Sequence, residues 1–138
     1  MQLYSGPLNP EAIVDATKKL RDIFLNLEPK EGPEKMLKAA LLIFPYMKDS
    51  DYALIDQAQV ALKDMFVPHG LMAGQFYGKC EEGGVRNPDF RPLRSPVPMI
   101  AMRHMAPQDI VFLIGSPAHF QAYCNLYTAD QVPNNLKS

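Results

Sequence analysis

The sequence predicts an α+β fold, in which helices cover one face of a small, mostly antiparallel sheet. Segments with apolar residues at helical spacing alternate with short, continuous apolar runs, and two strand-like segments flank one long loop. Prolines and glycines separate the elements. A chain of 138 residues is one domain by length, so we expect a single domain over 1–138, with frayed termini at 1–8 and 131–138.

The first predicted helix begins at Asn9-Pro10-Glu11. There a capping side chain precedes proline at the first helical position and an acid in the first turn. Apolar residues then recur at helical spacing until Pro29 ends the segment. The next run, Met36–Phe44, is short, apolar and stopped by Pro45, which predicts a buried central strand.

A second helix is predicted after Asp49-Ser50-Asp51, which supplies its cap. Its apolar stripe consists of Leu54, Ile55, Ala58, Ala61, Leu62, Met65 and Phe66. Pro68 and Gly70 close this helix, because proline cannot continue it and glycine suits its end.

Two further strands are predicted at 71–77 and 97–103, and we expect them to form a wide hairpin around the loop between them. Gly74 lies inside the first of these strands, which indicates a bulge or a close backbone approach. A short helix is expected from Pro107, and a last helix from Ser116-Pro117.

Composition excludes several classes of function. The 14 basic and 15 acidic side chains nearly balance, so we expect no nucleic-acid partner and no anionic membrane partner. The longest apolar run, Ala39–Phe44, is far too short to span a membrane, and no signal peptide is evident. Cys80 and Cys124 form no C-x-x-C pair, which favours a reducing, cytoplasmic setting.

Four of the five arginines fall in one window, 86–103, which contains no lysine and one acid. These four are Arg86, Arg91, Arg94 and Arg103. Four prolines stiffen the window by fixing φ. Since a guanidinium presents a planar fork of donors that fits carboxylate or phosphate, the window predicts an anion site.

The residues predicted to bind a small carboxylate or phosphate-bearing substrate are Arg91, Arg94, Arg103 and His104. In the alternative interpretation, the arginines pair within the chain and hold the loop down. Their partners would then be among Glu81, Glu82, Asp89 and Asp109.

No motif names a reaction, so the catalytic residues are unknown. The histidines His69, His104 and His119 have no metal-ligand spacing, and no catalytic triad, P-loop or dinucleotide motif is present. Tyr77 and Cys80 lie where the strand at 71–77 passes into the loop, and either type of residue can be an axial haem ligand. The alternative is a packing tyrosine and an incidental thiol.

One series of motifs is familiar. Gly70-Leu-Met-x-Gly74-x-Phe76 precedes Asn87-Pro-x-Phe-Arg-Pro-Leu-Arg-Ser-Pro-x-Pro98, then Ala101-x-Arg-His-Met105, then Asp109 and Phe112-Leu113. Over about 11–128 the chain resembles a family of uncharacterised microbial domains, a domain of unknown function. The members accompany small-molecule biosynthetic genes in bacteria and fungi.

The same region is similar, more distantly, to haem-dependent N-oxygenases that hydroxylate amino-acid amines or guanidines. In those enzymes a histidine stands where this chain has Tyr77. The resemblance implies that Tyr77 is the iron ligand if haem is the cofactor. It also implies that Arg91, Arg94 and Arg103 hold a haem propionate or a substrate carboxylate.

From these observations we expect an accessory or tailoring protein of a small-molecule, secondary-metabolite pathway, with an arginine-lined anion site and a possible partner enzyme of the same pathway. One alternative is a small haem-dependent enzyme that acts on an amino-acid-like substrate. Another is a non-catalytic interaction or dimerisation module, in which the strand 36–44 would pair across an interface if it lay at a sheet edge.

Overall fold

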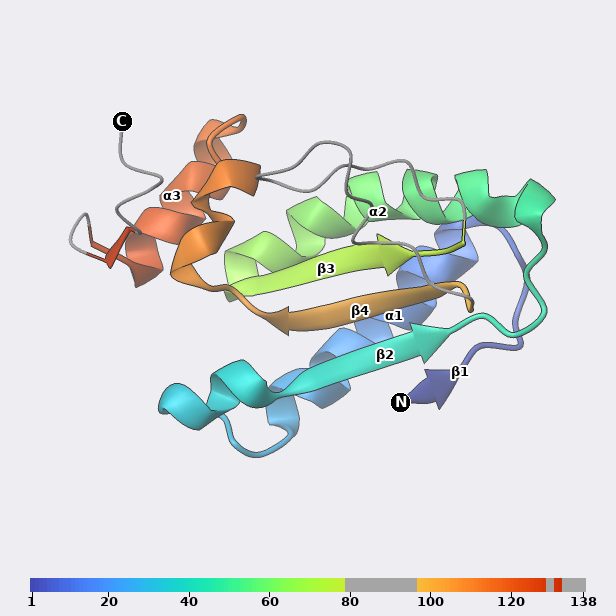
Figure 1. The fold of residues 1–138 in the computed structure, drawn as a ribbon, viewed down its shortest axis with the longest axis horizontal. Helices are drawn as coiled ribbons and strands as arrows, with labels where there is room; N and C mark the ends of the chain where they lie inside the picture. The colour runs from blue at the N-terminus through green and yellow to red at the C-terminus, as the bar shows by residue number, and fades with distance from the viewer. Residues whose placement is uncertain (79–96, 129–130, 133–138) are drawn as a thin grey trace.

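A four-stranded sheet and two long helices form the two layers of the fold (Figure 1). The computed structural model describes residues 1–78, 97–128 and 131–132. The strands are β1 (Gln2–Leu3), β2 (Ala39–Ile43), β3 (Leu71–Phe76) and β4 (Met99–His104), in the order β1–β2–β4–β3. Helices α1 (Pro10–Asn26) and α2 (Tyr52–Phe66) pack together on one face of this sheet. The predicted α+β class is confirmed.

The sheet is antiparallel except at one edge. β4 pairs antiparallel with β2 on one side and with β3 on the other, as predicted for the hairpin around the long loop. β1 pairs in parallel with β2, and the Tyr4 N–H donates to the Ile43 carbonyl at 2.7 Å. This short strand lies within 1–8, the segment that we expect to fray. Because β2 has a neighbour on each side, it is not an edge strand.

Side chains bind free backbone groups at both ends of α1. The Asn9 side chain accepts the Ala12 N–H at 2.8 Å, and Pro10 occupies the first helical position, as predicted. At the other end the Lys38 Nζ donates to the carbonyls of Phe24 (3.0 Å) and Leu27 (2.6 Å). A cation at the carbonyl end also opposes the helix dipole favourably.

The predicted strand at 36–44 begins too early. Residues Pro33–Leu37 form a 3-10 helix, η1, and the strand starts at Ala39. Gly32 with φ of 79° and Pro33 direct the chain into this turn, and Leu37 is 89% exposed. The prediction was wrong here because periodicity does not separate a short apolar strand from an apolar helical turn.

The second helix follows its predicted boundaries, but the side chain of its N-cap residue, Asp51, makes no capping hydrogen bond to it. A 3-10 turn, η2 (Asp49–Asp51), leads into α2, and a second one, η3 (Val67–His69), ends at Gly70. Gly70 has φ of 73°, a left-handed conformation that favours glycine. Residues 86–96, the first part of the arginine window, lie outside the described residues.

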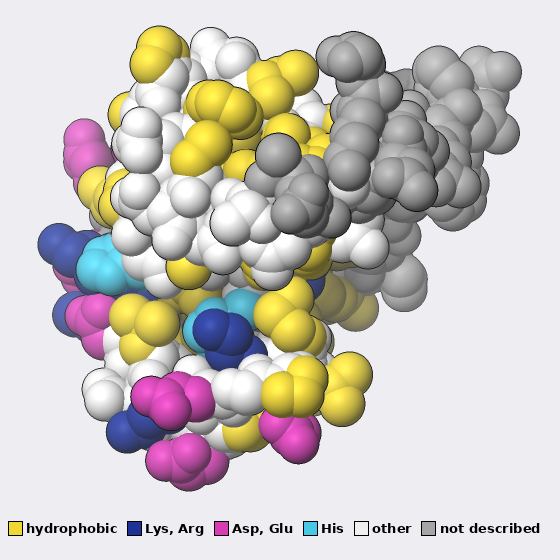
Figure 2. Space-filling model, turned by 90° about the vertical axis from the view of Figure 1, so that its left-hand side faces the viewer, with side chains coloured by type: hydrophobic (Ala, Val, Ile, Leu, Met, Phe, Trp, Pro, Cys, Tyr) yellow, Lys and Arg dark blue, Asp and Glu magenta, His cyan; other side chains and the backbone are white. Residues whose placement is uncertain are grey.

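The carboxyl-terminal elements lie at one end of the sheet (Figure 1). They are η4 (Pro107–Phe112), a 3-10 helix, and α3 (Pro117–Leu126), which Ser116 caps by accepting the His119 N–H. Both η4 and α3 begin at the residues predicted from the sequence. Figure 2 views this end: hydrophobic side chains gather on the upper half, over α3 and η4, and charged ones on the lower half, over η1.

The main core lies between the sheet and the two long helices. Buried residues from the strands meet buried residues of α1 and α2, among them Leu42, Ile100, Met102, Phe24, Ile55, Leu62 and Phe66. A smaller cluster of Val67, Met105, Leu113 and Tyr123 joins α3 to the end of the sheet. None of the helices in the described part of the chain has the length and apolar character needed to cross a membrane.

Candidate functional site

The face of the sheet opposite α1 and α2 is almost entirely apolar. Alternate residues of a strand point to opposite faces, so the neighbours of the buried core residues point away from these helices. They are Ala39, Leu41, Ile43, Met72, Gly74, Phe76, Met99, Ala101 and Arg103. A solvated sheet face normally carries polar residues, so this set is typical of a face that contacts another molecule or another part of the chain.

A cavity of about 320 Å³ opens on this face. Its floor includes Gly74 and Ala101, which are register partners on neighbouring strands. Neither residue has a side chain larger than a methyl group, so the surface is lowest there. The cavity extends around β3 toward Gln59 and Lys63 of α2.

The backbone conformation at Gly74 does not require a glycine. Its φ is not in the positive range, and a Cβ added there would have its nearest neighbour, a ring carbon of Phe76, at 3.7 Å. The register of β3 on β4 runs without interruption, so no bulge requires the glycine. Within the described residues, neither a bulge nor a close backbone approach therefore accounts for Gly74.

Arg103 is the charged residue on this face, and Asp109 holds it in place. The Arg103 Nη1 and Nη2 donate to the two carboxylate oxygens of Asp109 at 2.7 and 2.8 Å. Asp109 is 2% exposed and also accepts the Ala106 N–H at 2.7 Å. The hydrogen bond to Asp109 raises the pKa of the Arg103 guanidinium. One of the predicted internal pairings thus exists, and the Arg103 side chain still keeps 45% of its surface exposed.

Two polar side chains of α2 line the other side of the cavity. The Gln59 Nε2 donates to the Ala73 carbonyl of β3 at 2.6 Å, while its Oε1 is buried without a partner in the described structure. The Lys63 Nζ donates to the Phe112 carbonyl at 2.5 Å. These bonds fix α2 and η4 around the cavity.

His104 does not share this site with Arg103, because consecutive strand residues face opposite ways. Its ring lies 5.2 Å from the Phe24 ring, on the helix side of the sheet. Its Nε2 is buried and has no partner among the described residues. Burial lowers the pKa of His104, and the charges of Lys35 and Lys38 lower it further.

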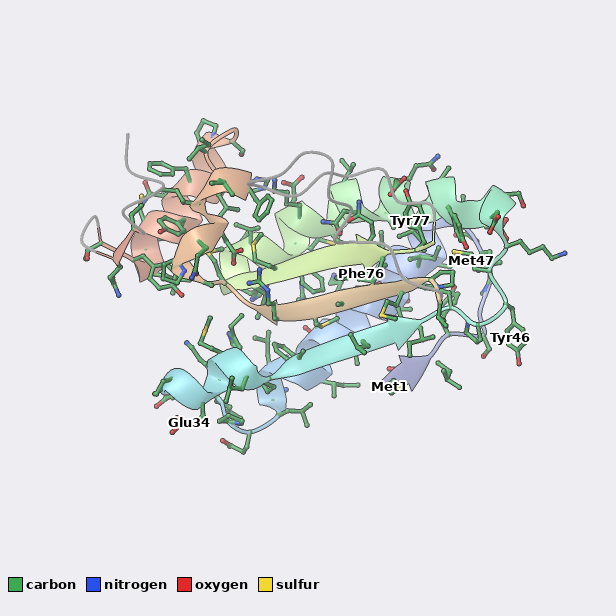
Figure 3. All side chains as sticks on the ribbon, in the orientation of Figure 1. Met1, Glu34, Tyr46, Met47, Phe76 and Tyr77 are labelled. Atoms are coloured by element: carbon green, nitrogen blue, oxygen red, sulfur yellow. The ribbon has the colours of Figure 1, made fainter. Side chains whose placement is uncertain are left out.

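Tyr77, the residue implied as a haem ligand, lies beside α2 (Figure 3). Its hydroxyl donates to the Asp56 Oδ2 at 2.8 Å, and its ring lies 4.6 Å from that of Tyr52. The side chain is 8% exposed. In this structure Tyr77 therefore connects the end of β3 to α2.

The other sequence candidates are dispersed or undescribed. Arg91 and Arg94, with Arg86 and Cys80, lie outside the described residues. His119 bonds to the exposed Asp64 at 2.7 Å, and His69 is exposed in η3. In the described ranges no three His, Cys, Asp or Glu side chains gather as a metal site would need.

These features define a two-layer α+β domain with a ligand-sized cavity on the sheet face opposite α1 and α2. The chain belongs to the family described as "Domain of unknown function (DUF6875)", whose model matches residues 2–138. No curated protein and no solved structure matches it significantly. Membership confirms the resemblance to a domain of unknown function. The link to biosynthetic genes and the similarity to haem-dependent N-oxygenases stay predictions.

Proposed function

We propose that this domain binds a small organic anion in the cavity on the sheet face opposite α1 and α2. The observation that carries the proposal is an apolar cavity of about 320 Å³ with one arginine, Arg103, on its wall. Small-molecule sites are concave and mostly apolar, with a few polar groups that orient the ligand. The Arg103 and Lys63 side chains supply those groups here.

In this proposal the domain is an accessory or tailoring protein of a small-molecule biosynthetic pathway. Support for the pathway comes from the motif between Asn87 and Pro98, which resembles domains that accompany such genes. An accessory protein would hold an intermediate for a partner enzyme. A tailoring enzyme would convert it, and turnover by the isolated protein separates the two roles.

The test is to fill the cavity from its floor. Gly74→Ile places a β-favouring side chain where an added Cβ meets nothing closer than 3.7 Å, so the fold should persist. Gly115→Ile is the matched control, because a Cβ there has nothing within 4 Å and Gly115 is not among the cavity residues.

The measurement is saturation-transfer NMR with a panel of small aliphatic and aromatic organic acids. We expect binding by the wild type and by Gly115→Ile, and loss of binding in Gly74→Ile at an unchanged melting temperature. If Gly74→Ile binds the same acids as the wild type, or if no acid binds the wild type, the proposal is wrong.

A further inference from the structure

We propose that the ligand of the cavity is a monocarboxylate with an apolar body, and that Arg103 binds its carboxylate side-on through Nε and Nη2. This inference rests on the proposed function, because it names the class of molecule that occupies the same cavity.

The free donors of Arg103 identify the binding edge. A guanidinium has five N–H donors in a planar fork. The Nη1 group donates to Asp109 at 2.7 Å and to the His104 carbonyl at 3.0 Å, and Nη2 donates once to Asp109 at 2.8 Å. Within the described structure, the Nε–H and the second Nη2–H have no partner. These two donors lie parallel on one edge of the fork, which is the geometry that accepts both oxygens of a carboxylate.

Asp109 prepares this edge for a ligand. Because the buried carboxylate fixes the opposite edge of the guanidinium at two points, the arginine is already ordered before binding. An ordered side chain loses less conformational entropy when it binds than a free surface arginine does. The 45% exposure of the Arg103 side chain leaves part of it accessible.

The local charges favour one negative charge on the ligand. Among the described residues that line the cavity, Lys63 and Arg103 carry the formal charges, and both are positive. Asp109 offsets one of them, so two positive charges minus one leave a net charge of +1. A monoanion matches this charge, whereas a dianion brings an additional, unmatched charge into an apolar site.

The cavity floor accounts for the apolar body. Arg103 is the register partner of Met72, and Phe76 lies four residues further along β3, or about 13 Å at the usual rise of a strand. The low Gly74–Ala101 pair lies between these two side chains on the same face. A ligand whose carboxylate is at Arg103 therefore extends along β3 over apolar atoms.

The first test compares three probes with the same phenyl group: 3-phenylpropanoate, its neutral amide 3-phenylpropanamide, and the dianion benzylmalonate. In titrations of the wild type at pH 7.5 we expect the propanoate to bind about tenfold tighter than the amide, because a two-point, charge-assisted pair adds about that much affinity. Benzylmalonate should bind no tighter than the propanoate.

Arg103→Lys tests the edge itself, because lysine keeps a cation for Asp109 but has no second pair of fork donors. The variant should bind the propanoate as weakly as the amide, and its affinity for the amide should equal that of the wild type. A second measurement uses the wild-type protein, so it does not depend on whether Arg103→Lys folds correctly. In ¹⁵N NMR, the Arg103 Nε–H resonance should shift with the propanoate and not with the amide.

The outcomes separate this inference from the proposed function. If propanoate and amide bind the wild type equally, and Gly74→Ile excludes both, the carboxylate assignment is wrong and the cavity proposal stands. The assignment is also wrong if the Nε–H resonance does not respond to bound propanoate. If neither probe binds the wild type, both proposals are overturned.

Discussion

Arg103 and Asp109 form a two-point ion pair, with N–O distances of 2.7 and 2.8 Å, that joins the end of β4 to η4. The carboxylate is the buried partner, because 3% of the Asp109 side chain is exposed against 45% of the Arg103 side chain. Asp109 also accepts the Ala106 N–H that begins η4. One carboxylate thus positions both the arginine of the cavity and the first turn after the sheet.

Asp109→Ala should lower the free energy of unfolding by about 2 kcal/mol, because it leaves the Ala106 N–H without its acceptor and removes the partner of Arg103. Thermal or urea unfolding measures the change. Asp15→Ala is the control: its ion pair with Lys19 is solvent-exposed, so its removal should change stability by less than about 1 kcal/mol. Equal effects of the two substitutions would contradict the role of Asp109.

The sequence predicts the helix boundaries well because caps are local signals. Asn9-Pro10 and Ser116-Pro117 begin helices in which the capping side chain accepts a backbone N–H from within its own first turn. The boundary at 36–44 was wrong because an apolar run carries no such signal. Only the tertiary contacts of β2 decide which of its residues are strand.

The site was less predictable, since it depends on register. The cavity floor forms because Gly74 and Ala101, 27 residues apart, become partners across β3 and β4. A glycine inside a strand, such as Gly74, is unusual in the sequence alone, but the residue opposite it depends on strand pairing that local sequence does not specify. Gln59 and Lys63 were missed, because polar residues on an amphipathic helix are normally solvated. Among the acids suggested for the arginines, the fold brings Asp109 to Arg103.

Gly74→Ala should raise the stability by about 0.5 kcal/mol, because alanine restricts the unfolded chain and fits the β conformation without a clash. The same substitution at Gly70 is the matched contrast. There φ is 73° and a Cβ would lie 3.1 Å from a Leu126 methyl, so Gly70→Ala should destabilise by about 1 kcal/mol or more. Urea unfolding of both variants measures the difference, and a loss of stability in Gly74→Ala would show that its backbone needs glycine.

Tyr77→Phe should lower the stability by about 1 kcal/mol, since it deletes the hydrogen bond to Asp56 and keeps the ring contact with Tyr52. Tyr46→Phe is the control, because Tyr46 is 75% exposed and should tolerate the change. The two melting temperatures are compared at the same pH. If Tyr77→Phe has the same melting temperature as the wild type, the hydrogen bond between Tyr77 and Asp56 contributes nothing to stability.

His104 should make the stability depend on pH below about pH 7. Burial, then Lys35 and Lys38, lower its pKa in the folded state below the ordinary value near 6.5, which the unfolded chain retains. In that interval the unfolded state binds more protons than the folded state, so stability increases with pH. The contribution is complete above about pH 7 and is lost as the pH falls through the lowered pKa of the folded state.

His104→Leu isolates this contribution, because it removes the titrating group and the buried, unpartnered Nε2 and keeps a similar volume beside Phe24. At pH 8 the variant should be as stable as the wild type or more so. From pH 7 to pH 5 its advantage should widen, since the wild type alone loses the His104 contribution. Urea unfolding at several pH values measures the stability of both proteins. Lys35→Gln should also weaken the pH dependence of the stability, because it removes one of the two positive charges that lower the pKa of His104. Parallel stability curves for wild type and His104→Leu would show that His104 does not control the pH response.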